Sequence, residues 1–185
     1  MNTAVIEIRQ ALNNILANRK DVVKLASQQR AKFEGWLKLE LAAALCSKVG
    51  FEKIILEDGY STNGRSDISF EYEGAKCYIE MKTANTSWRA EDLEKLTRPI
   101  TRNIDGIIED IIVLREKCAP AHGIVVFCVF PVPNRLWKNT REQLNYHLRR
   151  IEEEGELPQD TIIDNAVYVE TTRDFGVCTF VLEIT

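Results

Sequence analysis

The stretch from Gly123 to Phe130 constrains the fold more than any other part of this sequence. It consists of apolar residues and glycine only, and prolines follow it at positions 131 and 133. An apolar run of this length between turn residues is typical of a strand that is buried on both faces. Because such a strand needs a layer of structure on each side, the run favours an α/β sandwich.

Helical and strand patterns alternate along the rest of the chain. Apolar residues at helical spacing predict helices over 1–18, about 21–48, 88–99, 100–119 and 138–154, the second ended by Gly50 and the third by Pro99. Strand patterns lie in 53–56, 66–72, 76–82, 166–171 and 177–184, and turns are expected over 57–64. The sequence therefore predicts a central mixed β-sheet flanked by helices.

Length and composition limit the class of protein. The chain has 185 residues and a mass of 21.2 kDa, which suits one domain, and it shows no internal repeat or linker. None of its five cysteines lies in a Cys-x-x-Cys pair, so we expect free thiols in a reducing compartment. No apolar run approaches the ~20 residues of a transmembrane helix, and no signal-peptide core is visible. We therefore expect a cytoplasmic protein with no membrane partner.

Charge is distributed unevenly along the chain. Residues 1–50 contain eight Lys or Arg against four Asp or Glu, whereas residues 51–185 contain sixteen against twenty-four. The net charge of −4 and the pI near 5.4 argue against a protein that coats nucleic acid by bulk charge. The positive N-terminal part leaves room for a local surface that faces phosphate groups.

Two carboxylates and a lysine are expected to meet on one β-hairpin. A tight turn joins the strand that begins near Asp67 to the strand that contains Glu80 and Lys82. Side chains alternate along a strand, so Glu80 and Lys82 share one face. The hairpin can bring Asp67 beside them.

These residue types suit a metal site that acts on phosphate. Asp67 and Glu80 supply hard oxygen ligands for Mg²⁺ or Mn²⁺, and the backbone carbonyl of Met81 is a further candidate ligand. A metal ion there would polarise a phosphoryl oxygen and lower the pKa of a bound water. Lys82 would stabilise the developing charge. The pattern therefore predicts hydrolysis of phosphodiester bonds.

A carboxylate from the preceding helix is expected to join the site. The inward stripe of that helix includes Phe33, Leu37 and Leu41. Glu40 lies on one flank of the stripe, about 60° from its centre at ~100° per residue, and is the preferred candidate. Glu34 occupies the opposite flank and is its rival.

The order of these residues resembles the PD-(D/E)xK nuclease superfamily, which has the restriction-endonuclease-like fold. Asp67 is followed, after twelve residues, by Glu80-Met81-Lys82, and a helix with an acidic residue precedes both. Ser66 stands where the family often has proline. The resemblance implies that Asp67 and Glu80 bind Mg²⁺ or Mn²⁺, that Lys82 is catalytic, and that Glu40 supports the metal.

The resemblance also implies an architecture and a function for the whole chain. It predicts a three-layer restriction-endonuclease-like α/β sandwich in one domain, residues 1–185. Residues 1–30 would be an extra helical extension, 31–131 the nuclease-like core, and 132–185 a C-terminal helix with closing strands. The implied activity is that of a metal-dependent endonuclease that hydrolyses nucleic-acid phosphodiesters, with DNA as the expected partner and a homodimer left open.

Basic and aromatic residues near the hairpin are candidates for nucleic-acid contact. They are Lys76, Trp88, Arg89, Arg98, Arg102 and Arg135. The basic side chains would bind phosphates, and a base would stack on Trp88. Trp88 has a second interpretation, as a lid over the apolar stripe of the following helix.

Two other functions are consistent with the sequence. The chain could be a catalytically inactive member of the same fold that serves as a binding or assembly module. It could also be an unrelated α/β interaction protein in which Asp67 and Glu80 match the motif by chance. The distance between those two carboxylates and their ability to bind Mn²⁺ separate these alternatives.

Overall fold

The computed structural model describes residues 2–29, 31–61, 64–88, 100–135, 142–159 and 161–184. The helices are α1 (Asn2–Asn18), α2 (Lys20–Gln29), α3 (Glu34–Cys46), α4 (Thr101–Lys117), α6 (Glu142–Glu154) and α7 (Thr161–Asp164). The strands are β1 (Phe51–Leu56), β2 (Gly59–Ser61), β3 (Gly64–Arg65), β4 (Ile68–Tyr72), β5 (Ala75–Asn85), β6 (His122–Pro133), β7 (Val167–Glu170) and β8 (Phe175–Ile184).

Six of these strands form one mixed sheet. Its order is β1-β4-β5-β6-β8-β7, and β2 pairs with β3 in a separate two-stranded ladder. Strands β5 and β6 run parallel from Cys77 opposite His122 to Asn85 opposite Phe130, while the other neighbouring strands of the six-stranded sheet are antiparallel. The predicted α/β class with a mixed central sheet is therefore confirmed.

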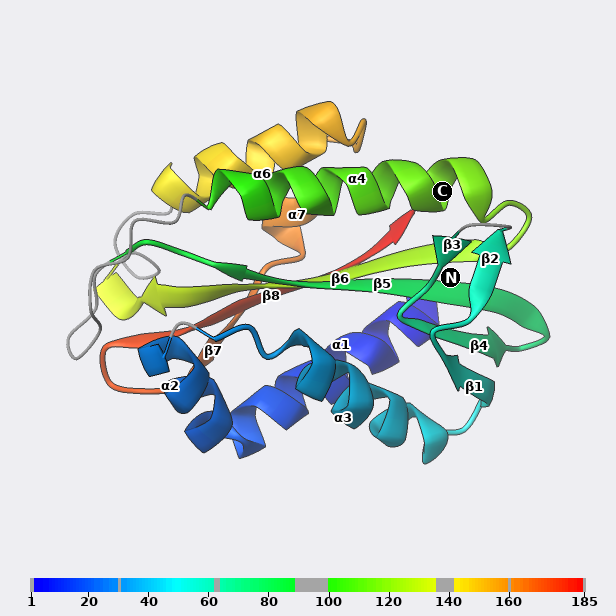
Figure 1. Cartoon of the computed structure of the whole chain (residues 1–185), viewed down its shortest axis with the longest axis horizontal. Helices are drawn as coiled ribbons and strands as arrows, with labels where there is room; N and C mark the ends of the chain where they lie inside the picture. The colour runs from blue at the N-terminus through cyan, green and yellow to red at the C-terminus, as the bar shows by residue number, and fades with distance from the viewer. Residues whose placement is uncertain are drawn as a thin grey trace.

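Helices cover both faces of the sheet. In Figure 1, α1, α2 and α3 lie below the sheet and α4 and α6 lie above it. Each face has its own apolar core, because alternate residues of a strand point to opposite sides. In β6, Ile124, Val126 and Cys128 join the core on the α1–α3 face, whereas Val125 and Phe127 join the core under α4 and α6.

Several patterns found in the sequence are confirmed by this arrangement. Every residue of β6 from Gly123 to Pro133 is buried, as expected for a strand with a layer on each side. The stripe that includes Ile104, Ile107 and Ile111 packs α4 onto the sheet, and α4 ends before Pro120. Of the helix predicted over 88–99, Trp88 is not helical and residues 89–99 lie outside the described residues.

The predicted β4–β5 hairpin is also confirmed. The register places Ile68 opposite Ile79 and Tyr72 opposite Ala75. The turn residues Glu73 and Gly74 have φ angles of 51° and 82°. Positive φ at both central residues is the requirement of a two-residue hairpin turn whose twist matches the strands, and glycine meets it without strain.

Two sequence predictions are wrong. The single helix expected over 21–48 is two helices, α2 and α3, because the chain leaves the helical path before Phe33. The Phe33 ring is buried and lies 4.5 Å from the ring of Phe130, at the far end of β6. The segment 57–64, expected to be turns, contains β2 and begins β3.

Within the described part of the chain, no helix is long and apolar enough to cross a membrane.

Candidate functional site

The candidate site lies where β4 and β5 separate. Pairing between the two strands begins at Ile68 opposite Ile79, yet β5 continues to Asn85. Backbone N–H groups of β5 beyond Ile79 therefore need acceptors other than β4, since a buried strand edge cannot leave them unpaired without cost.

Two carboxylates accept hydrogen bonds from this edge. The backbone N–H of Met81 donates to Oδ2 of Asp67 over 2.8 Å, and the N–H of Thr83 donates to Oε2 of Glu34 over 2.8 Å. Because the N–H and C=O of one residue in a strand point to the same side, the carbonyl of Met81 points to this edge as well. Two acids from different elements are thus fixed beside one segment of β5.

Glu80 and Lys82 lie on the face of β5 that α4 covers. Their neighbours of the same parity, Tyr78 and Ala84, contact the core under α4. From α4, Oδ2 of Asp110 lies 3.0 Å from Nζ of Lys82. Lys82 therefore has a fixed anionic partner above the sheet.

The carboxyl group of Glu80 is buried in an acidic environment. Glu80 is only 7% exposed. Burial, together with the charges of Asp110 and Asp67, raises the pKa of Glu80 to about 8, while Lys82 and a hydrogen bond from Tyr60 oppose the shift. A positive charge added next to Glu80 would therefore be strongly stabilised.

Lys82 remains protonated in this setting. Burial lowers its pKa, but the ion pair with Asp110 outweighs burial and raises the pKa of Lys82 above its ordinary value. Burial raises the pKa of Asp110 to about 6, against the lowering effect of Lys82. The pair thus presents a permanent ammonium group beside Glu80.

Asp67 has a cationic partner of its own. Nζ of Lys38, on α3, lies 3.1 Å from Oδ1 of Asp67 and also contacts the carboxylate of Glu57, the residue after β1. The side chains of Lys38 and Asp67 are 17% and 19% exposed, so this pair is shielded from solvent. Both oxygens of Asp67 are therefore engaged.

The structure places the predicted trio around one stretch of β5. Asp67 precedes Ile68, which pairs with Ile79, and its carboxylate is bonded to the N–H of Met81. The charges of Asp67 and Lys82 both act on the pKa of Glu80. The rival helix carboxylate, Glu34, is the one bonded to β5, and its charge also acts on Lys82.

Glu40, the preferred helix carboxylate, lies elsewhere. Oε1 of Glu40 accepts a hydrogen bond from the Trp36 indole over 3.1 Å and lies 3.5 Å from Arg19. The two flanks of the α3 stripe face different surroundings, and the flank of Glu34 and Lys38 faces the site. The expectation that Glu40 reaches the site is corrected in favour of Glu34.

Two of the residues predicted to contact nucleic acid have partners within the fold. Nζ of Lys76 lies 2.8 Å from Asp58 and 2.9 Å from Oγ of Ser69, so it links β5 to β4 and to the segment after β1. Trp88 is partly buried against the core under α4, which agrees with its interpretation as a lid.

The four arginines in that prediction divide into two groups. Arg102 and Arg135 are exposed. Arg89 and Arg98 lie outside the described residues.

Three site residues were missed in the sequence. Asp110 interrupts the flank of an otherwise apolar helical stripe, which is a signal that periodicity could have given. Lys38 lies four residues after Glu34, the i, i+4 spacing that puts two side chains on one flank. Tyr60 lies in a segment assigned to turns, and nothing in its pattern linked it to Glu80.

The donor set fits an open site for a hard divalent cation. Among the described residues, no three His, Cys, Asp or Glu side chains lie together so that they could hold a metal ion by themselves. Mg²⁺, however, is usually bound by one or two carboxylates, with waters and phosphate oxygens as the other ligands. Asp67, Glu80 and the carbonyl of Met81 match that type of site.

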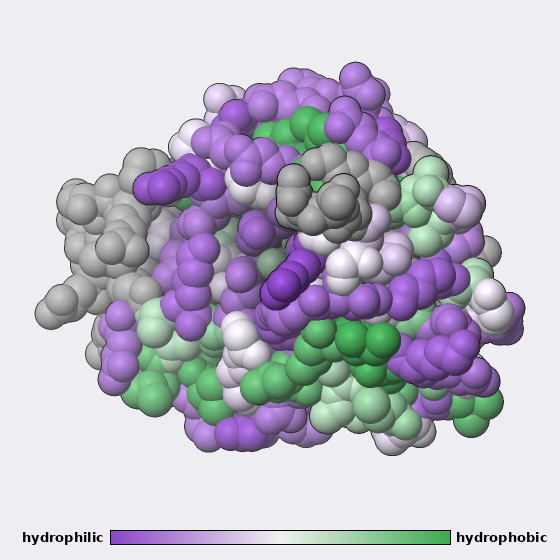
Figure 2. Space-filling model, turned by 45° about the vertical axis from the view of Figure 1, so that its right-hand side comes forward, coloured by the Kyte–Doolittle hydropathy of each residue, from purple (hydrophilic) through white to green (hydrophobic). Residues whose placement is uncertain are grey.

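One face of the molecule is mixed in character. Figure 2 shows a hollow in the middle of this face with hydrophilic residues around it and a band of hydrophobic residues below. Exposed apolar side chains on α3 and β1 include Leu39, Ile55 and Leu56.

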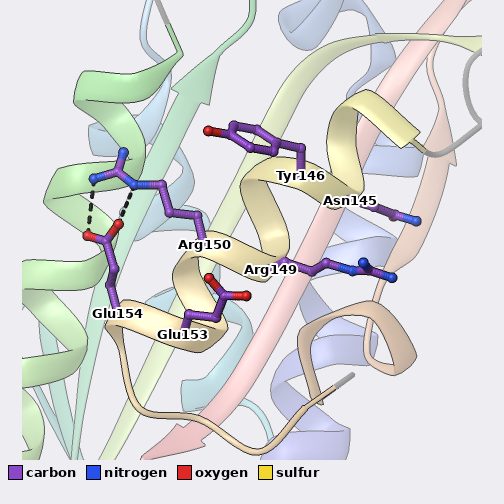
Figure 3. A pocket seen from close by; sticks show the side chains of 6 residues that line it. All are labelled: Asn145, Tyr146, Arg149, Arg150, Glu153 and Glu154. Carbon is purple, nitrogen blue, oxygen red and sulfur yellow. Dashed lines mark hydrogen bonds and ion pairs between the residues drawn. The ribbon is translucent and has the colours of Figure 1, made fainter.

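A separate hollow lies on the outer side of α6. Its lining comes from that helix alone (Figure 3): Asn145, Tyr146, Arg149, Arg150, Glu153 and Glu154. The guanidinium of Arg150 is bound by Glu154 within the hollow and by Asp105 of α4. None of the predicted site residues belongs to it.

Comparison of the chain with family models, with curated proteins and with solved structures found no match in any of the three.

Proposed function

We propose that this protein is a metal-dependent nuclease of the PD-(D/E)xK type that hydrolyses phosphodiester bonds in DNA. One observation carries the proposal: the Asp67 carboxylate is bonded to the backbone of β5 at Met81, between Glu80 and Lys82. A chance match to the motif would not require Asp67 to bond to β5 between the other two motif residues.

The order of the elements supports the same assignment. Along the chain, α3, β1, β4, β5, α4 and β6 come in this order, with the short β2–β3 ladder between β1 and β4, and β5 and β6 are parallel. Helix, three antiparallel strands, helix and a parallel strand is the order expected of the restriction-endonuclease-like sandwich. Under this proposal, α1 and α2 are an N-terminal addition to that core.

Each site residue has a role in the proposed reaction. Asp67 and Glu80 would hold Mg²⁺ or Mn²⁺, with the Met81 carbonyl as a further ligand. The chemistry supplied by the bound cation is polarisation of a phosphoryl oxygen and acidification of a water molecule. Glu34 fixes the edge of β5 through the N–H of Thr83, so it keeps the ligand-bearing strand in place.

Lys82 acts as a fixed positive charge. Its ammonium group, held by Asp110, can bind a phosphoryl oxygen and stabilise the negative charge that develops there. Because the pKa of Lys82 is raised, the side chain stays charged across the working range of pH and is not the proton acceptor.

A second candidate function is a binding module without catalysis. The ion pairs Lys82–Asp110 and Lys38–Asp67 favour it, since both could serve the fold alone. The two functions differ in what divalent cations do: the nuclease needs them, and the binding module does not.

A nicking assay tests the proposal. Purified protein with Mg²⁺ or Mn²⁺ should convert supercoiled plasmid to the open form, and EDTA should stop the reaction. Lys82→Ala should abolish it, whereas Lys53→Ala, which removes an exposed lysine paired with Glu71 on the same sheet, should leave it unchanged. Activity that survives Lys82→Ala with an intact fold would overturn the assignment.

A further inference from the structure

Lys38 stands at the position where a cation would approach Asp67. Its Nζ lies 3.1 Å from Oδ1 of Asp67, and Oδ2 of the same carboxylate accepts the N–H of Met81 over 2.8 Å. A charge-assisted pair at this distance, shielded from solvent, is among the stronger polar contacts in a protein. A divalent cation must compete with it for the same oxygen.

Lys38 also has a second anion within reach. The Glu57 carboxylate contacts the same ammonium group, and its side chain is 54% exposed. Glu57 is tied to the site through the backbone, because its N–H donates to the carbonyl of Asp67 over 3.2 Å. The ammonium group can therefore leave Asp67 and keep an ionic partner.

The other carboxylate of the site is neutralised differently. Glu80 has a hydrogen bond from Tyr60 and the through-space charge of Lys82, whose ion pair is with Asp110. Of the two proposed ligands, Asp67 is the one whose own ion pair must open.

We propose that Lys38 is the built-in counter-ion of Asp67, and that a divalent cation binding to Asp67 displaces the Lys38 ammonium group from Asp67 and leaves it paired with Glu57. This inference rests on the proposed metal site. It adds a control on that site: Lys38 sets the concentration of divalent cation that the protein needs. The raised pKa of Lys38, which its bonds to Glu57 and Asp67 produce against the lowering effect of burial, keeps the counter-ion charged.

Mn²⁺ binding to the full-length chain, followed by electron paramagnetic resonance, measures this control without any substrate. Lys38→Met should tighten Mn²⁺ binding by about tenfold, because the competing ion pair is gone. Lys38→Arg keeps the charge and the pair, so it should bind Mn²⁺ no more tightly than the wild type. Glu57→Gln removes the alternative partner and should weaken binding by about threefold.

Lys82→Met is the matched control for charge. It removes one positive charge from the same site but releases Asp110 rather than Asp67. The proposal predicts a clearly smaller gain for Lys82→Met than for Lys38→Met. Equal gains would mean that the lysines act only through space, and would overturn the displacement.

The outcomes also separate this inference from the metal site. Mn²⁺ binding that Asp67→Asn abolishes but Lys38→Met leaves unchanged overturns the role of Lys38 and keeps the site. An absence of binding in the wild type, Lys38→Met and Lys38→Arg together overturns the site and the inference with it. Binding that appears only in Lys38→Met supports the inference in its strongest form.

Discussion

Strands β5 and β6 lie side by side in the same sheet but differ in the kinds of residue that they bury. They pair over nine residues, from Cys77 and His122 to Asn85 and Phe130. Strand β6 is buried and apolar from Gly123 to Pro133, whereas β5 carries Glu80 and Lys82 in its middle. Burial of apolar surface stabilises a fold by roughly 25 cal/mol per Å², but burial of a charge costs free energy unless a partner compensates it.

The difference shows how the fold tolerates a charged site. Strand β6 provides apolar contacts to both layers, and β5 places its charges where β4 has turned away and α4 offers Asp110. Stability and chemistry are therefore divided between adjacent strands. Variants that change one strand without the other test this division.

Glu80→Gln should have the largest and most asymmetric effect. The substitution removes a proposed metal ligand, so plasmid nicking should fall by about 10³-fold or more. At pH 8 without divalent cation, the same variant should be as stable as the wild type or more stable, because a buried carboxylate has been replaced by a neutral group. Urea unfolding beside the nicking assay measures both, and a variant that loses stability at pH 8 would contradict the account of β5.

Phe127→Ala should affect stability through β6. The Phe127 ring is fully buried and stacks on Phe180 with ring centroids 4.4 Å apart. Its loss should lower the free energy of unfolding by about 3–5 kcal/mol in urea. Ile55→Ala, on the exposed side of β1, is the control and should cost far less. Equal costs for both would remove the distinction between core and edge strands.

The stability of the chain in EDTA should depend on pH through Glu80. Its pKa is raised from 4.5 to about 8 in the folded protein, so the native state binds more protons than the unfolded state between these values. The free energy of unfolding should therefore fall as pH rises from about 5 to 8, by an amount on the order of a few kcal/mol. The raised pKa of Asp110 changes the free energy of unfolding in the same direction. Glu80→Gln should flatten the slope, and a wild-type slope that rises over this range would refute the burial effect.

Substitutions on the two flanks of α3 should differ modestly in their effect on nicking. Glu34→Gln weakens the acceptor for the Thr83 N–H at the end of β5, so nicking should fall by about tenfold. Glu40→Gln changes a surface contact with Trp36 and Arg19 and should leave nicking within about twofold of wild type. The reverse ranking would restore Glu40 as the helix residue of the site.

Local patterns in the sequence were enough to predict the strands of the six-stranded sheet and to place Asp67, Glu80 and Lys82 beside one hairpin. The apolar run of β6, the turn at Glu73-Gly74 and the shared parity of Glu80 and Lys82 depend only on near neighbours in the chain. The partners of the trio could not be predicted in this way. Lys38 and Asp110 come from helices on opposite faces of the sheet, so their approach depends on packing.

The errors have the same origin. The break between α2 and α3 depends on the contact between Phe33 and Phe130, which lie far apart in the sequence. The choice between Glu34 and Glu40 depends on which flank of α3 faces β5, and the helical pattern treats both flanks alike. Long-range contacts thus decided the details that local pattern left open.

The most direct test of the central claim is the position of a divalent cation. Crystals grown with Mn²⁺ would reveal it by anomalous diffraction. We expect a Mn²⁺ peak bonded to a carboxylate oxygen of both Asp67 and Glu80, with the Lys38 ammonium group separated from Asp67 and still paired with Glu57. A peak at other acidic residues only, with Asp67 still paired to Lys38, would contradict it.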